Sequence, residues 1–251
     1  MKNRNKSLNG SSRRWRRPLA HLAFVALLAL PATTSNAGLI SSNTGASESG
    51  LGSFTGSIGV SNNTATTATI TVMLTNTSPL ANGGFITAFA FNDPGTASGG
   101  DIERVTGFTA TDPDFDLLGG PVVSDSIKAV PLGDFDIGAS ISGDFLGGGN
   151  PNPGLGVGES ATFTFNVTGT NLLNLSQASL EAALTDGSGG RSSFFAVRFR
   201  GFEDGGSDKV PAEPDDVVVS AVPEPGTITM ALIGSIPLGL TAWRRRRRAI
   251  A

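Results

Sequence analysis

The sequence has 251 residues, of which 18 are basic and 21 acidic, with 34 glycines, 14 prolines and no cysteine or tyrosine. Its one histidine, His21, and its tryptophans, Trp15 and Trp243, lie near the two ends, so the segment 38–222 has no His, Cys, Trp or Tyr. That segment therefore cannot hold a serine–histidine–acid triad, a cysteine nucleophile, a common zinc site or a disulfide.

The first 37 residues have the order of a secretory signal peptide. Seven basic residues occur among the first 17, followed by the apolar stretch Leu19–Leu30 and by Ser-Asn-Ala at 35–37. Small residues of this kind form the site at which signal peptides are cut, so we expect cleavage after Ala37 and export of the rest. The 12 apolar residues are too few for a stable membrane span.

The segment 38–222 is strongly acidic. It has six basic residues against twenty acidic ones, a net charge of −14, whereas the whole chain carries −3 because both of its ends are basic. Negative charge of this size attracts divalent cations and repels the phosphates of nucleic acids and anionic lipids. We therefore expect no nucleic-acid partner.

Alternating apolar and polar residues predict a protein built from strands. In Ala68–Leu74 the even-numbered residues are aliphatic and the odd ones are mostly threonine, as in a strand with one buried and one wet face. Four runs alternate most clearly: Ala68–Leu74, Phe85–Phe91, Ala161–Val167 and Phe195–Arg200. Less regular candidates are Ser53–Val60, Ile102–Phe108, Ser126–Val130, Phe135–Ile141 and Val217–Ala221. In the second run, Phe85, Phe89 and Phe91 are expected on one face.

One segment has helical character. Ser176 can accept a hydrogen bond from a free backbone N–H group at the start of a helix, and the apolar spacing extends to Leu184. We expect Leu180, Ala183 and Leu184 to face inward, with the helix ended by Gly187.

Short strands separated by Gly- and Pro-rich turns predict an all-β fold, an antiparallel two-layer β-sandwich whose topology is Ig-like or jelly-roll-like. We place this domain at residues 52–202. The segment 38–51 is expected to be flexible, and 203–221 to be an acidic linker. A single transmembrane helix is expected near the C-terminus.

The last 30 residues have a three-part order typical of a sorting signal. The motif Val222-Pro223-Glu224-Pro225 comes first, and its prolines cannot lie inside a helix or a central strand. The apolar run 227–243 follows, with 17 residues or about 25 Å as a helix, close to the lower limit for crossing a bilayer. Five arginines then hold the following end in the cytoplasm: Arg244, Arg245, Arg246, Arg247 and Arg248.

This order resembles the PEP-CTERM sorting domain of Gram-negative bacteria, whose members share a Val-Pro-Glu-Pro motif, one hydrophobic span and a terminal arginine cluster. The resemblance covers residues 222–251. It implies that the protein is anchored transiently in the inner membrane and processed at the motif by an exosortase, a membrane-embedded protease. Display at the cell surface, or release into an exopolysaccharide or biofilm matrix, would follow. An ordinary C-terminal membrane anchor is the alternative.

Alternating aspartates suggest a metal site. Asp112, Asp114 and Asp116 alternate along one segment, and Asp134 and Asp136 repeat the arrangement, so their carboxylates could meet one Ca²⁺ ion. The segment departs from an EF-hand loop, because it lacks the glycine at the sixth position and the glutamate at the twelfth. A solvated acidic turn is the alternative.

A second charged set surrounds the last clear strand. It consists of Arg191, Arg198, Arg200, Glu203, Asp204 and Asp208. Such a set can form surface ion pairs, each worth about 0–1 kcal/mol, or an anion site.

The sequence therefore favours a non-catalytic exported protein without a resident cofactor other than a possible Ca²⁺ ion. Its expected partners are the secretion machinery, an exosortase and exopolysaccharide. A carbohydrate-binding or Ca²⁺-binding adhesion module is the second interpretation, although only phenylalanine could stack on a sugar. A glycosidase is the least favoured, since no pair of carboxylates stands out.

Overall fold

The computed structural model describes residues 36–214. The predicted signal peptide up to residue 35, the sorting motif at 222–225, the apolar run 227–243, the arginine cluster and the strand at Val217–Ala221 all lie outside these residues. Among the described residues, none belongs to a helix that is long and apolar enough to cross a membrane.

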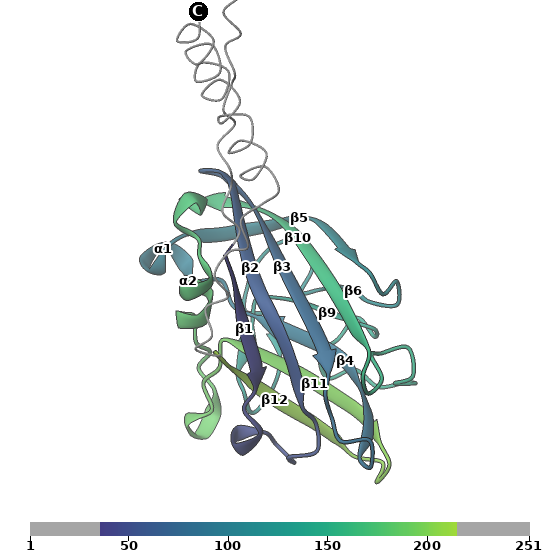
Figure 1. Cartoon of the computed structure of the whole chain (residues 1–251). Coiled ribbons are helices and arrows are strands. Elements are labelled where there is room, and N and C mark those ends of the chain that lie inside the picture. Colours follow the sequence, from purple (N-terminus) through teal and green to yellow (C-terminus); the bar gives the residue numbers. More distant parts are fainter. Residues whose placement is uncertain (1–35, 215–251) are drawn as a thin grey trace, which may run out of the picture. The chain divides into compact units, whose positions relative to one another are not determined.

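Strands dominate the described part of the chain (Figure 1). They are β1 (Asn36–Ser42), β2 (Phe54–Thr64), β3 (Thr67–Asn76), β4 (Gly83–Phe91), β5 (Asp101–Ala110), β6 (Asp116–Leu118), β7 (Ile127–Lys128), β8 (Asp134–Phe135), β9 (Ile137–Ser140), β10 (Ser160–Thr170), β11 (Phe195–Phe202) and β12 (Ser207–Pro214). The α-helices are α1 (Gly95–Ser98) and α2 (Gln177–Ala182), and single 3-10 turns occupy Thr44–Ala46, Leu172–Asn174 and Ser188–Gly190.

Ten strands form one sheet in the order β5-β10-β3-β2-β1-β12-β11-β4-β9-β6, and β7 pairs with β8. Every pair of neighbouring strands is antiparallel, so the prediction of an all-β antiparallel fold is confirmed. We call β5, β10, β3, β2 and β1 the first half of the sheet and the other five strands the second half. The two halves join where β1 pairs with β12, with Ile40 opposite Pro214.

The sheet is nearly closed, because the chain that leaves β6 runs along the free edge of β5. There the Val105 N–H donates to the Pro121 carbonyl at 3.0 Å, and the Val123 N–H donates to the Glu103 carbonyl at 3.1 Å. An exposed strand edge invites pairing with other chains, so these bonds protect β5 from aggregation.

Phenylalanines hold the two halves of the sheet face to face. Phe89 of β4 lies 4.6 Å from Phe163 of β10, measured between ring centroids, and stacks on Phe195 at 5.6 Å. Phe91 meets Phe165 edge-on at 5.4 Å. Such pairs add about 0.5–1.5 kcal/mol each to the burial of their rings. Phe163, Phe165 and Val197, which lie at alternating positions in two of the clearest predicted strands, are fully buried.

The period of two is confirmed in the first half of the sheet. In β3 the residues Ala68, Ile70, Val72 and Leu74 are buried, and they alternate with more exposed neighbours. The matching strand β10 buries residues 161, 163, 165 and 167 in the same way. Both strands therefore have one dry face and one face rich in threonine.

In β4 the predicted alternation, which placed Phe85 on the same face as Phe89 and Phe91, was wrong for Phe85. Phe199 pairs with Ile86 whereas Arg198 pairs with Ala88, so Thr87 is an extra residue that forms a β-bulge. A bulge shifts the alternation by one position. As a result, Ile86 joins Phe89 and Phe91 in the main core, and Phe85 does not.

Three strands of the second half, β4, β9 and β11, are buried on both faces, which the alternating pattern did not predict. The outer faces of β4 and β11 present small side chains, Ala88, Ala90 and Ala196, to a second apolar cluster. The larger residues of this cluster come from the segments around β6 to β8 and after β9: Leu118, Ile127, Leu132, Phe135 and Phe145. Alanines leave room for these residues to pack against the sheet.

Both flanks predicted to be flexible contain strands instead. Residues 36–42 form β1 in the middle of the sheet, and 207–214 form β12 beside it. Asp208, expected in an acidic linker, is fully buried, and its carboxylate accepts the backbone N–H groups of Ser49, Leu51 and Gly52 at 2.9, 2.8 and 3.1 Å. These bonds hold the segment before β2 against β12, so Asp208 connects the N-terminal flank to the C-terminal one.

The predicted helix is present but shorter than expected. Ser176 caps α2 and forms a reciprocal pair of hydrogen bonds with Ser179, which confirms the predicted N-terminus. Leu180 is buried as expected. The helix ends at Ala182, however, so Leu184 lies beyond it with 59% of its surface exposed, and the prediction that Leu184 faces inward was wrong.

Candidate functional site

The expected signal cleavage site lies at the beginning of a central strand. Ala37 pairs with Gly59 of β2 and is exposed, while the next residue, Gly38, is buried. A Cβ atom on Gly38 would lie 1.3 Å from the Nε2 atom of Gln177 in α2, so a larger residue there would displace the end of the Gln177 side chain. Cleavage after Ala37 would therefore remove two residues of β1 and leave its packed part, 38–42, in the sheet.

The three aspartates predicted to bind Ca²⁺ lie in a turn before and at the start of β6. The Asp112 carboxylate accepts the Asp114 N–H at 3.0 Å, and Phe115 between the aspartates is buried. Asp114 and Asp116 are exposed. Within residues 36–214 no group of three acidic side chains is arranged to hold a metal ion. The structure thus shows the hydrogen bond of an acidic turn at this place.

Arg198 and Arg200 of β11 bind the loop at residues 145–149 rather than the neighbouring acids. Arg198 donates through Nη1 to the carbonyls of Phe145 and Gly147, at 2.5 and 3.1 Å, and Arg200 donates to Gly149 at 2.7 Å. Burial lowers the pKa of Arg198, and the charge of Arg200 adds to this shift. In the described chain the ion pairs are Lys128–Asp134 and Lys209–Glu48, so the predicted network with Glu203, Asp204 and Asp208 was wrong.

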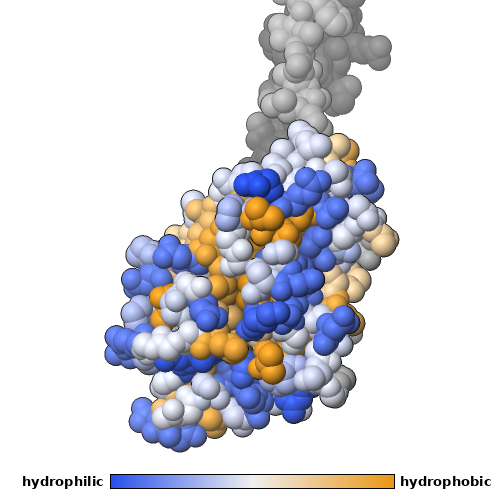
Figure 2. All heavy atoms as spheres, turned by 180° about the vertical axis from the view of Figure 1, so that it is seen from behind, coloured by the Kyte–Doolittle hydropathy of each residue, from blue (hydrophilic) through white to orange (hydrophobic). Residues whose placement is uncertain are grey.

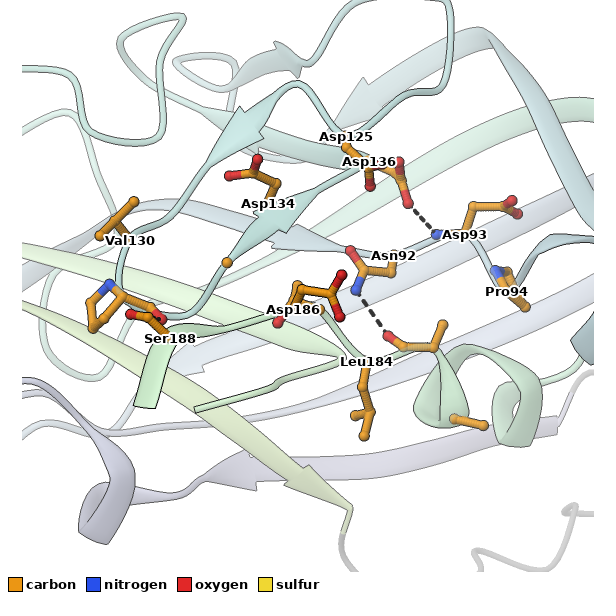
Figure 3. A pocket seen from close by; sticks show the side chains of 15 residues that line it. Asn92, Asp93, Pro94, Asp125, Val130, Asp134, Asp136, Leu184, Asp186 and Ser188 are labelled. Atoms are coloured by element: carbon orange, nitrogen blue, oxygen red, sulfur yellow. Dashed lines mark hydrogen bonds between the residues drawn. The ribbon is translucent and has the colours of Figure 1, made fainter. Parts of the chain in front are cut away.

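Acidic residues from four separate segments line a pocket of about 620 Å³ at one end of β4 (Figure 3). We call it the acidic pocket. Its polar lining comes from the end of β4, the segment before β7, the region of β8 and the chain beyond α2: Asn92, Asp93, Asp125, Asp134, Asp136 and Asp186. Val130 and Leu184, both more than half exposed, add apolar surface to the same pocket.

Backbone hydrogen bonds fix two of these carboxylates. Asp93 begins an Asp-Pro-Gly turn directly after β4, and its carboxylate accepts the N–H groups of Ile102 at 2.8 Å and Gly95 at 3.0 Å. Asp136 lies between β8 and β9, and its Oδ2 atom accepts the Asp93 N–H at 2.9 Å (Figure 3). The two side chains are thereby held at the same wall of the acidic pocket.

Both carboxyl groups have raised pKa values. Burial raises the pKa of Asp93 from 3.8 to about 7, and the charges of Asp101 and Asp136 add to the shift, while the hydrogen bonds from Ile102 and Gly95 oppose it. Burial likewise raises the pKa of Asp136, with a contribution from Asp125. The wall therefore carries negative charge that is poorly solvated and, at neutral pH, Asp93 is part protonated.

Asn92 contributes an acceptor that lacks a donor. Its side chain is 6% exposed, and its Nδ2 atom donates to the Ala183 carbonyl at 2.9 Å and to the Ser193 carbonyl at 3.5 Å. These carbonyls fix which end of the amide is the nitrogen. The Oδ1 atom then faces the other way, and it is buried with no hydrogen-bond partner (Figure 3).

Figure 2 shows apolar side chains lying between hydrophilic ones on the face turned away from the viewer in Figure 1. The large apolar residues that are exposed in the described chain are Met73, Leu80, Val122, Val130, Leu146, Leu173 and Leu184. None of these residues is aromatic. Most phenylalanines of the strands lie in the core, and Phe85 and Phe108 are half-buried. Aromatic side chains are the usual stacking surface for sugar rings.

Sequence reasoning found only parts of the acidic pocket. Asp134 and Asp136 were identified as alternating aspartates, whereas Asp93 was not singled out and lies in one of the Gly- and Pro-rich turns between strands. Asn92 and Asp186 carry no local signal, because they are 94 residues apart and meet only after the sheet has folded. The burial of Asp93 could not be predicted from the sequence either.

No protein family, curated protein or solved structure matches the chain with significant similarity.

Proposed function

We propose that this is a non-catalytic exported protein that is sorted through its C-terminal segment and processed there by an exosortase. The observation that carries the proposal is the order of three parts in the sequence: the motif Val222–Pro225, the apolar run 227–243 and the arginines 244–248. A signal peptide before residue 38 and an acidic segment between the two signals agree with export.

The position of the last strand supports processing at the motif. β12 ends at Pro214, so seven residues, 215–221, separate the folded sheet from Val222. Cleavage within 222–225 would leave every described strand uncut. The segment between the sheet and the motif is also shorter than the linker 203–221 expected from the sequence, since seven residues reach at most about 25 Å.

The domain that would be displayed is, in this proposal, a two-layer sandwich. Its support is the set of phenylalanine contacts between the two halves of the sheet, such as Phe89 with Phe163. In this proposal the two halves of the sheet are the two layers, and the pairing of β1 with β12 connects them along one side. An Ig-like or jelly-roll-like topology belongs to the same proposal.

Release into an exopolysaccharide or biofilm matrix is the destination that the resemblance implies. Sugar stacking on aromatic side chains does not support it, since the exposed large apolar residues of 36–214 are aliphatic. We therefore place the protein beside the polysaccharide without assigning it a carbohydrate-binding residue.

The sorting proposal is tested by changing the motif in a bacterium that has an exosortase. We expect Glu224→Ala, and separately Pro223→Ala with Pro225→Ala, to leave full-length precursor in the inner membrane. Immunoblots of fractionated cells would measure it. The chain offers a matched control in Glu213→Ala with Pro214→Ala, because this Glu-Pro pair is exposed at the end of β12 and lies outside the motif.

Normal maturation and export of the motif variants would overturn the proposal. Permanent retention of the unaltered protein in the inner membrane would also overturn it, and would establish the apolar run as an ordinary anchor. Equal retention of the motif variants and the control would show a folding defect instead of a sorting role for the motif.

A further inference from the structure

The acidic pocket has a size suited to a small organic molecule. Its volume of about 620 Å³ falls within the range of roughly 300–1,000 Å³ that is usual for ligand sites. A single ion needs far less space. In addition, no three acidic groups within residues 36–214 converge on one point as metal ligands do.

The charged side chains that line the acidic pocket are all carboxylates. Five aspartates contribute carboxylates, and no lysine or arginine lines the pocket, although Lys128 pairs with Asp134 from outside the lining. That pair is exposed and neutralises only one of the five charges. The carboxylates of Asp125 and Asp186 are exposed and unpaired among the described residues.

Asn92 gives an independent sign of a missing donor. A buried amide oxygen without a hydrogen bond costs about 1–3 kcal/mol, and such atoms are rare in folded proteins. The Oδ1 atom of Asn92 is in this state, while its Nδ2 atom is anchored to Ala183. Figure 3 shows the oxygen on the side of the Asn92 amide opposite its dashed hydrogen bond, and Asn92 lines the pocket. Because the oxygen is buried, a ligand N–H group would reach it by displacing part of the wall.

We propose that the acidic pocket binds a ligand that carries an ammonium group on a small aliphatic or ring skeleton. The negative charges of Asp125, Asp136 and Asp186 would attract the ammonium group, and the apolar side chains of Val130 and Leu184 would contact the carbon skeleton. A neutral sugar fits less well, because its hydroxyl groups bring no opposite charge to the carboxylates. This inference does not depend on the sorting proposal.

The test uses the full chain in non-ionic detergent and isothermal titration calorimetry with glucosamine and glucose. These two sugars share the same ring and differ by one ammonium group. We expect glucosamine to bind at least about tenfold more tightly than glucose, since only the amine can pair with the carboxylates. The diamine 1,4-diaminobutane should also bind, and should compete with glucosamine.

A matched pair of variants locates the binding site. Asp125→Asn with Asp186→Asn removes two charges from the acidic pocket and breaks no hydrogen bond found in the structure, so the fold should be kept. We expect it to weaken glucosamine binding at least about tenfold. The control, Asp114→Asn with Asp116→Asn, removes two exposed charges elsewhere and should change the affinity less than twofold.

Three results would overturn the inference. They are equal binding of glucose and glucosamine, equal loss of affinity in both double variants, which would indicate general charge attraction, and displacement of the amines by equimolar Ca²⁺ at constant ionic strength. The last result would identify the occupant as a metal ion. If the pocket variant failed to fold, the comparison of the two sugars on the unaltered protein would still decide the question.

Discussion

The two halves of the ten-stranded sheet bury their strands differently. In the first half, β3 and β10 have one dry face and one face of threonines that meets solvent. In the second half, β4, β9 and β11 are buried almost throughout, because a second apolar cluster covers their outer faces. The first half therefore contacts the core on one face only, whereas the second half is also covered by the segments that form the second apolar cluster.

The acidic pocket belongs to the covered half. Asn92 and Asp93 follow β4 directly, and Asp136 precedes β9. The segments that cover the second half also bring Asp125 and Asp134 to the pocket, and Asp186 comes from the chain after α2. The acidic pocket therefore lies where the chain adds segments beyond the strands of the sheet.

The largest effect is expected where the two halves meet. Phe165 of β10 contacts Phe89, Phe91 and Phe108 at 6.2, 5.4 and 5.1 Å. Phe165→Ala should lower the free energy of unfolding by about 3–5 kcal/mol, because it removes these contacts and leaves a cavity. Its neighbour Thr164, on the wet face, gives the control: Thr164→Ala should cost less than about 1 kcal/mol.

Urea unfolding followed by circular dichroism would measure both variants. Fluorescence is unsuitable, because residues 38–222 contain neither tryptophan nor tyrosine. Equal losses of stability from Phe165→Ala and Thr164→Ala would contradict the assignment of the two faces.

The next effect concerns the hydrogen bonds of Asp208, which hold the segment before β2 against β12, the strand at which the two halves join. Asp208→Ala would leave the backbone N–H groups of Ser49, Leu51 and Gly52 without their acceptor, so we expect a loss of about 3 kcal/mol. Asp204→Ala is the control, because Asp204 is exposed and accepts only from Gly206 within its own turn. A proteolysis assay should show cleavage between residues 43 and 52 in the Asp208 variant alone.

A smaller effect compares the outer faces of the two halves. Ala90 of β4 is fully buried by the second cluster, whereas Thr71 of β3 is exposed on the outer face of the first half. Ala90→Leu should cost about 1–3 kcal/mol through overpacking. Thr71→Leu should change stability by less than about 0.5 kcal/mol. Chemical denaturation would decide, and similar values for the two variants would mean that the outer faces do not differ.

The smallest effect concerns the charge of the acidic pocket. Because the pKa of Asp93 is raised from 3.8 to about 7 in the folded protein, the folded state holds this proton more tightly than the unfolded state. The resulting stabilisation is complete below about pH 4 and is lost as the pH rises through about 7. The melting temperature should therefore carry a falling contribution from Asp93 across this window.

Asp136→Asn sharpens this prediction. It removes one of the charges that raise the pKa of Asp93, so the Asp93 carboxyl should titrate at a lower pH. Carbon NMR of the Asp93 carboxyl would follow the titration directly. Asp114→Asn serves as the control, and a shift of the same size in that variant would argue against a local effect of Asp136.

Some of the fold could be read from the sequence because local chemistry and tertiary structure agree there. The alternation of β3 and β10 survives because each strand has one face in the core and one in water. The cap at Ser176 could also be predicted, because it is a hydrogen bond between residues three positions apart. The β-bulge at Thr87 was not, because it depends on the register between β4 and β11.

Less of the candidate site than of the fold could be predicted from the sequence. An acidic composition usually marks a solvated linker, so β12, with Asp208 and Glu213, resembled one. Only the three N–H groups that converge on Asp208 make its burial favourable. Likewise, the Asp112–Asp116 segment looked more like a metal site than the dispersed residues of the acidic pocket.

The sequence by itself determined the all-β antiparallel class, the wet and dry faces of β3 and β10, the start of α2 and the exclusion of histidine and cysteine chemistry between residues 38 and 222. These properties depend on composition and on neighbours a few positions apart. Tertiary structure alone decided the seam between β1 and β12, the double burial of the second half and the meeting of Asn92, Asp93 and Asp186 in one pocket. They depend on contacts between distant segments, and a side chain's burial, charge state and hydrogen-bond partners exist only once those contacts have formed.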